Sequence, residues 1–213
     1  MILSTPTILL ALLGQAILTL IEPALGRLFG LVGGALAAQL LFIGLLTVVL
    51  WRAIRIDHAP RDALGFAGTG WWTVLHTPLI WLFLFFGYRI ISFFVIQVSG
   101  LPGYLDGADA FYDLPLWLQI TDVVLISAGL YWLLVVIAIE GLRGLGLARW
   151  QAVLLPVLLL SVPHLPYWGP GPTLVLGLSS LVLCLFYLWR RDVLALIIAD
   201  LAVDLYNTLV AAN

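Results

Sequence analysis

The sequence predicts an all-α protein, a polytopic transmembrane helical bundle of about seven helices, with a range of seven to eight. Its composition is 63% hydrophobic. Charged residues make up only 9%, whereas a soluble domain carries about 25%. Long apolar runs recur along the whole chain, and about 17–25 such residues suffice to cross a bilayer. Residues 1–213 therefore form a single integral membrane domain, since the longest polar stretches, 52–70 and 99–114, cannot bury a core of their own.

Several functional classes are excluded by composition. The net charge of −2 argues against a nucleic-acid partner. The single cysteine, Cys184, allows neither a disulfide framework nor a cysteine metal site. No phosphate loop, dinucleotide fingerprint or CxxC motif is present. The expected partners are the lipid bilayer and other membrane proteins.

The seven predicted spans are bounded by helix-ending or interfacial residues. The first ends near Glu22-Pro23, and the second is glycine-rich, which permits close helix contact. The third opens with Trp71 and Trp72 as interfacial anchors. A turn-forming proline- and glycine-rich stretch separates the fifth from the sixth. The spans are about 5–22, 28–51, 71–98, 115–140, 149–164, 172–189 and 192–211. An eighth span, or a re-entrant piece within 56–70, is the alternative.

Arginine placement predicts the orientation. All nine basic residues are arginines, and seven follow the second, fourth and sixth spans. Loops rich in arginine stay in the cytoplasm, so we expect a cytoplasmic N-terminus and an external C-terminus in a bacterial inner (cytoplasmic) membrane. The seven arginines are Arg52, Arg55, Arg61, Arg143, Arg149, Arg190 and Arg191.

The candidate polar site lies in the last three spans. Asp200 and Asp204 are four residues apart, which places them on one helix face. Counting about 1.5 Å per residue puts His164 and Asp204 at the same depth, about 20 Å from the cytoplasmic edge. Intramembrane acids usually mark function, although a neutralised pair that holds helices together is the alternative. A metal site needs at least three ligands, and His164, Asp200 and Asp204 supply three only if both acids point inward.

Two other intramembrane charges need partners. Arg89 and Asp122 fall in the outer halves of the third and fourth spans, and a buried structural ion pair is the simplest account. Glu140 ends the fourth span one turn before Arg143, which predicts a solvated helix-end pair.

Three stretches, 62–66 (DALGF), 159–166 and 197–204, carry a motif pattern in the last two thirds of the chain. Through them, about residues 60–206 resemble the CPBP family of CAAX prenyl proteases and bacteriocin-processing membrane proteins. The stretch 159–166 (LLSVPHLP) is similar to the family's Phe-x-x-x-His motif, with His164 as its histidine. The stretch 197–204 (IIADLAVD) is similar to the final His-x-x-x-Asn or His-x-x-x-Asp motif, and it ends at Asp204. In the family, the histidines of these motifs and a glutamate of a further motif, Glu-Glu-x-x-x-Arg, are thought to activate water against a peptide carbonyl. The resemblance implies a catalytic site at His164, Asp200 and Asp204, with a divalent metal such as zinc only in an active enzyme.

The motifs depart from the family pattern in two places. Asp200 stands where the family has its second histidine. The family's di-glutamate would fall near Tyr131 and Trp132, where no acid is present, and Glu140 is too close to the membrane edge to replace it. Asp122 folding back towards the site is the other possible replacement.

Three functions follow from this pattern. The first is a catalytically degenerate CPBP-like protein that acts as a membrane scaffold, accessory subunit or assembly partner and requires no cofactor. The second is an active intramembrane endopeptidase built on His164, Asp200 and Asp204. The third is a small proton-linked transporter that uses the same acids, although the chain lacks the repeated broken helices typical of transporters.

Overall fold

The computed structural model describes residues 3–104 and 111–211, and this part of the chain is helical without a strand. The all-α prediction is therefore confirmed. Six of its helical segments are long and apolar enough to cross a membrane: 5–56, 71–98, 116–144, 149–168, 170–190 and 193–210. The elements are α1 (Thr5–Trp51), α2 (Trp71–Leu82), α3 (Tyr88–Ser92), α4 (Leu116–Leu130), α5 (Ala138–Gly144), α6 (Arg149–Ser161), α7 (Leu165–Trp168), α8 (Pro170–Arg190) and α9 (Val193–Ala211). Short π-helical stretches at 83–87 and 93–98 continue α2 and α3, and one at 131–137 joins α4 to α5.

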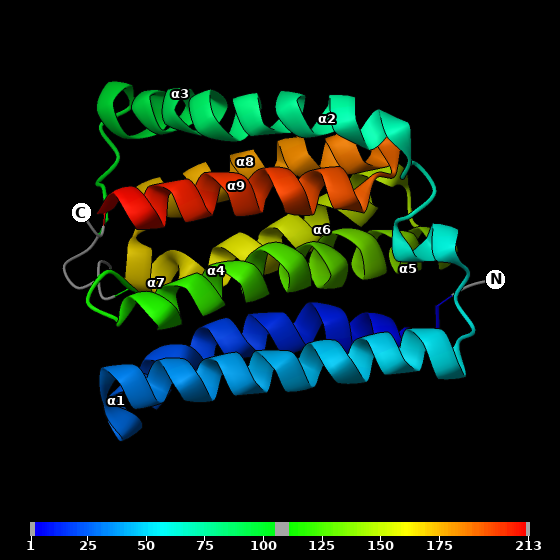
Figure 1. Cartoon of the computed structure of the whole chain (residues 1–213), viewed down its shortest axis with the longest axis horizontal. Coiled ribbons are helices and arrows are strands. Elements are labelled where there is room, and N and C mark those ends of the chain that lie inside the picture. The colour runs from blue at the N-terminus through cyan, green and yellow to red at the C-terminus, as the bar shows by residue number, and fades with distance from the viewer. Residues whose placement is uncertain (1–2, 105–110, 212–213) are drawn as a thin grey trace.

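The first segment reverses direction at Gly30, and Figure 1 shows its two limbs running side by side. Gly30 has φ 72° and ψ 171°, a conformation that suits glycine. The predicted end of the first span near Pro23 is wrong, because Pro23 lies inside the helix and membrane helices tolerate proline. The limbs approach so closely that a Cβ on Gly34 would lie 2.5 Å from the Cα atom of Gly26. The predicted glycine-mediated contact is therefore present between these two limbs.

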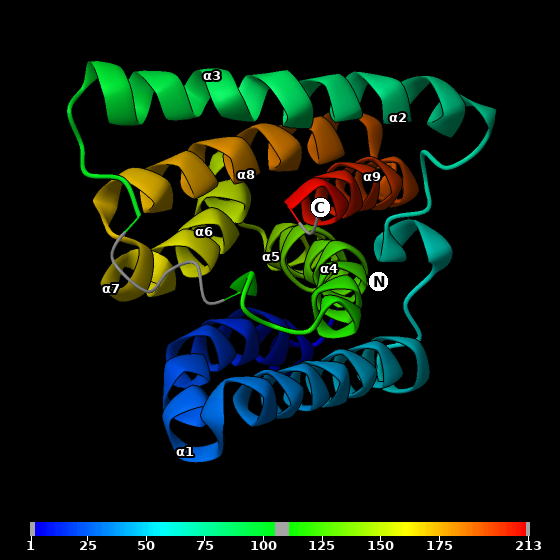
Figure 2. The same ribbon diagram turned by 60° about the vertical axis from the view of Figure 1, so that its left-hand side comes forward.

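The helix that spans 116–144 lies at the centre of the bundle. Its π-helical stretch includes Leu133, Val136 and Ile137, all fully buried. One apolar core forms between this helix and α1, and a second forms between it and α6, α8 and α9. The α1 hairpin and the 71–98 helix lie on opposite sides of this centre (Figures 1 and 2). The central helix thus contributes to both cores and fixes the positions of the helices around it.

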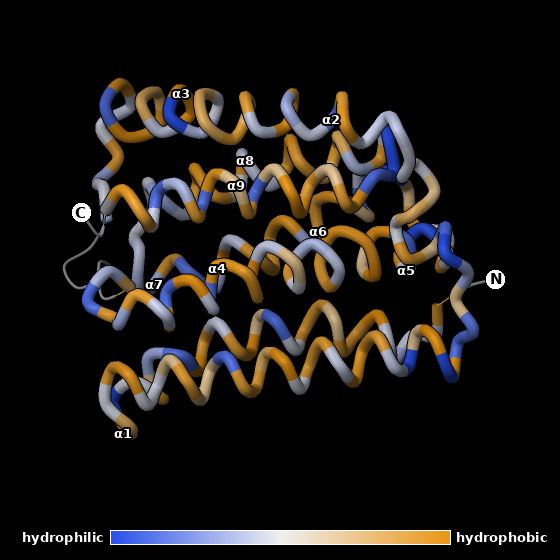
Figure 3. Tube along the Cα trace, in the orientation of Figure 1, coloured by the Kyte–Doolittle hydropathy of each residue, from blue (hydrophilic) through white to orange (hydrophobic). Residues whose placement is uncertain are grey.

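The outward surface of the helices is apolar. Residues such as Leu40, Val74 and Phe94 are exposed on the outer helices. Figure 3 shows hydrophobic residues along the lengths of the helices, with much of the hydrophilic colour gathered at the two ends of the bundle. Exposed apolar side chains around a polar-ended bundle are consistent with an integral membrane protein.

The three predicted arginine loops lie at one end of the bundle, which we call the arginine-rich end. The ends of α5 and α8 meet the beginnings of α2, α6 and α9 there (Figure 1). The start of α1 lies at the same end, since the backbone N–H of Ser4 donates to Asp57 Oδ2 at 3.1 Å. The end of α9 lies at the opposite end of the bundle (Figure 1).

Candidate functional site

A cavity of about 550 Å³ opens between the 71–98 helix, the central helix, α6, α8 and α9. Asp200 and Asp204 both line it, because their spacing of four residues places them on the same face of α9. Leu84, Leu130 and Val157 are among its apolar wall residues. The structure therefore brings the two predicted acids together in a cavity whose volume falls within the range of small-molecule sites.

Hydroxyl groups surround the innermost acid, Asp200. The Tyr131 hydroxyl is oriented towards the Asp200 carboxyl group, and Ser127 lies beside the same group from one turn earlier. Tyr131 occupies the place where the CPBP resemblance predicts a glutamate. A phenol donates a hydrogen bond but is no carboxylate base at neutral pH, because its ordinary pKa is about 10. The site therefore has a hydrogen-bond donor where the family pattern has a general base.

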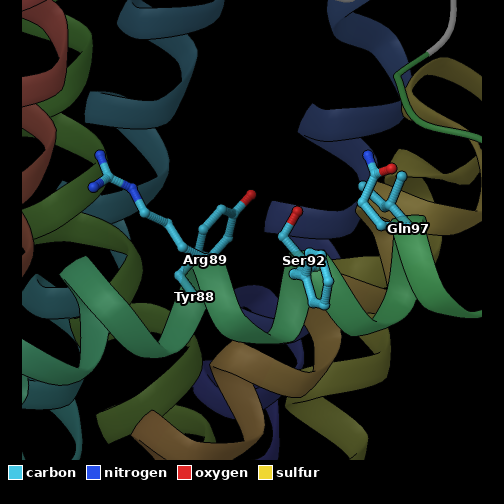
Figure 4. Close-up of a pocket in the computed structure, with 6 residues that line it drawn as sticks. Tyr88, Arg89, Ser92 and Gln97 are labelled. Carbon is cyan, nitrogen blue, oxygen red and sulfur yellow. The ribbon is translucent and has the colours of Figure 1, made fainter.

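Arg89 supplies a positive charge to the same cavity. Its guanidinium carbon lies 4.2 Å from the ring centroid of Phe85, a cation–π contact. Tyr88, Arg89, Ser92 and Gln97 project from one side of their helix (Figure 4), and they line a further hollow of about 280 Å³. The cavity therefore contains acids on α9 and a guanidinium on α3.

The structure does not bring Arg89 and Asp122 together. Asp122 Oδ1 accepts a hydrogen bond of 3.4 Å from Gln39 Nε2, at the contact between α1 and α4. Among the described residues, no ion pair joins Asp122 to Arg89, and Asp122 does not line the cavity. The expected ion pair is thus replaced by a neutral amide partner from α1, a contact that helix spacing alone does not reveal.

His164 lies outside the set of residues that line the cavity. Its Nδ1 atom lies 2.8 Å from the carbonyl oxygen of Leu160, and its ring packs on Trp168 with centroids 4.2 Å apart. Leu160 and Trp168 line the cavity, so His164 sits behind its wall. No group of three histidine, cysteine, aspartate or glutamate residues positioned for a metal ion occurs in the described ranges. His164, Asp200 and Asp204 therefore do not come together as the three-ligand metal site that the sequence allows only for an active enzyme.

One buried hydroxyl on the cavity wall lacks a partner. Ser179 is 4% exposed and lines the cavity. Its Oγ atom has no hydrogen-bond partner among the described residues. An unsatisfied buried polar group costs about 1–3 kcal/mol, and this Oγ atom is itself shielded from the open cavity.

Glu140 belongs to a separate cluster at the arginine-rich end. Its Oε2 atom lies 2.6 Å from Arg191 Nη2, and its Oε1 atom accepts a hydrogen bond of 3.2 Å from the Tyr187 hydroxyl. The predicted pair with Arg143 is present at 3.9 Å, but it is not solvated as predicted, because the Glu140 side chain is only 11% exposed. Burial alone would lower the pKa of Arg191, but Glu140 and Tyr187 outweigh it and raise that pKa. Glu140 is thus a structural ion-pair partner, and it does not line the cavity.

A buried polar network that the sequence pattern does not reveal lies at the same end. Asp192 is fully buried, and its Oδ2 atom lies 3.2 Å from His76 Nδ1 and 2.8 Å from Thr73 Oγ1. Its Oδ1 atom accepts the N–H of Ala195 at 3.1 Å, which caps the start of α9. Arg190 Nε donates to His76 Nε2 at 2.7 Å. An aspartate just before an apolar run predicts an N-cap, but no spacing signal predicts its contact with His76, 116 residues away.

Comparisons with protein-family models, with curated proteins and with solved structures each gave no match. The chemistry of the cavity is therefore the basis on which a function is inferred for this chain.

Proposed function

We propose that this chain is an integral membrane protein of seven spans that binds a polypeptide segment of another membrane protein in its cavity. In this proposal it is a CPBP-like scaffold or accessory subunit without hydrolytic activity. The two limbs of α1 count as separate spans, which brings the six apolar segments to seven. The arginine-rich end is cytoplasmic, by the preference of arginine for that side.

The observation that carries the proposal is the mixture of groups on the cavity wall. Asp200 and Asp204 accept hydrogen bonds, and Arg89 donates them. Leucine and valine side chains fill the space between these groups. A polypeptide segment carries N–H donors and C=O acceptors along an apolar chain, so its groups complement this wall. The displacement of His164 from the cavity removes the histidine that catalysis in the resembled family requires.

Site-directed photo-crosslinking tests this proposal. A photoreactive residue at Ser180, which lines the cavity, is expected to capture one discrete membrane protein at a near-equal amount. The control position is Val182 on the same helix, which is exposed and outside the cavity, and it should capture lipid alone. The double variant Asp200→Asn/Asp204→Asn should reduce capture at Ser180 about tenfold, because a charge-assisted hydrogen bond contributes about 1.5–3 kcal/mol. A lipid adduct at Ser180, or undiminished capture by the double variant, would refute the proposal.

A second candidate function is peptide hydrolysis by the two acids. Asp200 and Asp204 share the cavity, and the Tyr131 hydroxyl faces Asp200. Two neighbouring carboxyl groups can divide the roles of acid and base, since a like charge nearby favours protonation of one of them.

This hydrolase hypothesis predicts its own mutational pattern. Cleavage of membrane-associated peptides by the purified protein should fall at least a hundredfold in Asp200→Asn and in Asp204→Asn, because acid–base catalysis contributes about 10²–10⁴-fold. His164→Ala should retain cleavage, since His164 lies behind the cavity wall. If the well-folded wild-type protein cleaves no peptide, the hydrolase hypothesis is rejected and only the binding function remains.

A further inference from the structure

A cluster of aromatic and charged side chains lies where α2 begins and α8 ends. Trp72 and Trp189 are 47% and 68% exposed, as expected for tryptophans at a membrane surface. The guanidinium carbon of Arg190 lies 4.5 Å from the ring centroid of Trp189 and 5.8 Å from that of Trp72. Both rings are therefore within cation–π range of one half-buried arginine.

Arg190 is held in place from the protein interior. Its Nε atom donates to His76 Nε2 at 2.7 Å, so Nε2 is the acceptor of this hydrogen bond. The Nδ1 atom of the same ring lies 3.2 Å from the buried carboxyl group of Asp192. This chain of contacts orients the guanidinium and leaves its charge without an adjacent acid, since Arg190 forms no ion pair with a carboxylate in the described part of the chain.

Arg191, the next residue in the chain, has the opposite arrangement. Its guanidinium forms an ion pair of 2.6 Å with Glu140. Two consecutive arginines thus differ in their surroundings: Arg191 pairs with an internal acid, whereas Arg190 lies within cation–π range of two exposed tryptophans and forms no ion pair with a described residue.

We propose that Arg190, Trp72 and Trp189 form a binding site for the phosphate of an anionic phospholipid in the leaflet at the arginine-rich end. The Nη groups of the guanidinium, which the contact with His76 through Nε does not occupy, bind phosphate oxygens with the fork geometry that arginine offers. The exposed tryptophan faces lie beside the glycerol and upper acyl region, where such side chains concentrate in membranes. A phospholipid fits better than free phosphate because the site adjoins the apolar outer surfaces of α2 and α8, which include the exposed Leu75 and Leu185. His76 and Asp192 are positioning residues for this site.

Native mass spectrometry of the full chain in mixed micelles of phosphatidylglycerol and phosphatidylcholine tests this site. The wild-type protein is expected to retain one phosphatidylglycerol in preference to phosphatidylcholine. Arg190→Gln should weaken that retention about fivefold, because one basic residue contributes about 1 kcal/mol at an anionic surface. Arg61→Gln, which removes an exposed arginine at the same end, is the matched control and should leave retention unchanged.

Two further variants keep the result interpretable if Arg190→Gln misfolds. Trp189→Leu retains the His76–Arg190 contact but should still weaken retention about threefold, since an exposed cation–π pair contributes about 0.5–1 kcal/mol. His76→Phe removes the acceptor that orients Arg190 and should weaken retention although Arg190 itself is kept. Equal losses in Arg61→Gln and Arg190→Gln would overturn the proposal in favour of diffuse surface charge. Displacement of the lipid by inorganic phosphate alone would also overturn it, because the site would then recognise phosphate without the lipid.

Discussion

Replacing Asp192 by alanine is expected to lower the unfolding temperature by roughly 10 °C, which corresponds to about 3 kcal/mol of stability for a chain of this size. The fully buried carboxylate accepts hydrogen bonds from Thr73, His76 and the Ala195 backbone. Its removal leaves these donors unsatisfied in an apolar interior, where each orphaned group costs about 1–3 kcal/mol. The start of α9 loses its cap at the same time, which costs about 1 kcal/mol.

The chain contains its own reporter for this measurement. Cys184 is the single cysteine, and it is 3% exposed. A thiol-reactive fluorophore should therefore label the protein in detergent only as heating opens the bundle. Asp113→Ala is the control, because it removes an exposed loop aspartate, and it should change stability by no more than about 0.5 kcal/mol. Asp192→Asn retains one oxygen acceptor, so its melting temperature should lie between those of Asp192→Ala and Asp113→Ala. A melting temperature for Asp192→Ala within 2 °C of the wild-type value would contradict the structural role of the network.

Gly68→Ala is expected to destabilise the same end of the bundle by about 2 kcal/mol or more, the usual result of forcing atoms into packed structure. A Cβ at this position would lie 1.8 Å from the carbonyl oxygen of Arg190. No side-chain rotation can relieve this overlap, because the atom that the added Cβ meets belongs to the backbone of Arg190. The loop must instead move and lose the hydrogen bond of 2.9 Å from Gly68 N–H to the Arg191 carbonyl oxygen.

Gly70→Ala, two residues later in the same loop, is the matched control. Its added Cβ would meet nothing within 4 Å, and its backbone is extended with φ 163°. Thiol labelling of Cys184 should therefore give Gly70→Ala a wild-type melting temperature and Gly68→Ala a lower one. If both alanine variants melt together, the steric account of this loop is wrong.

Gly68 and Asp192 also affect the cavity. The 65–69 loop pairs with the α8–α9 turn through Gly68 and through the N–H of Val193, which donates to the Gly65 carbonyl oxygen at 3.1 Å. Asp192 caps α9 at the same turn, and Asp200 and Asp204 follow two and three turns later on that helix. The arginine-rich end therefore fixes the register of the helix that carries the cavity acids.

The sequence alone determined the helical character, most of the helix positions and the shared face of the two acids. Composition and run length predict apolar helices because few charges are tolerated within a membrane span. The spacing of Asp200 and Asp204 fixes their common face because helical geometry is local. The sequence does not determine that the chain reverses at Gly30, since Pro23 and three nearby glycines all signal a bend.

Only the tertiary structure decided which polar groups meet. His164 and the acids are level by residue counting, yet the histidine bonds to its own helix and lies behind Leu160 and Trp168. Rotation of a helix about its axis determines the direction of a side chain, and depth says nothing about that rotation. For the same reason Asp122 meets Gln39 rather than Arg89, and Asp192 meets a histidine 116 residues earlier in the chain. Contacts between distant helices arise from packing of the whole bundle. Local spacing therefore predicts which helices carry candidate residues, but it does not predict which of those residues meet.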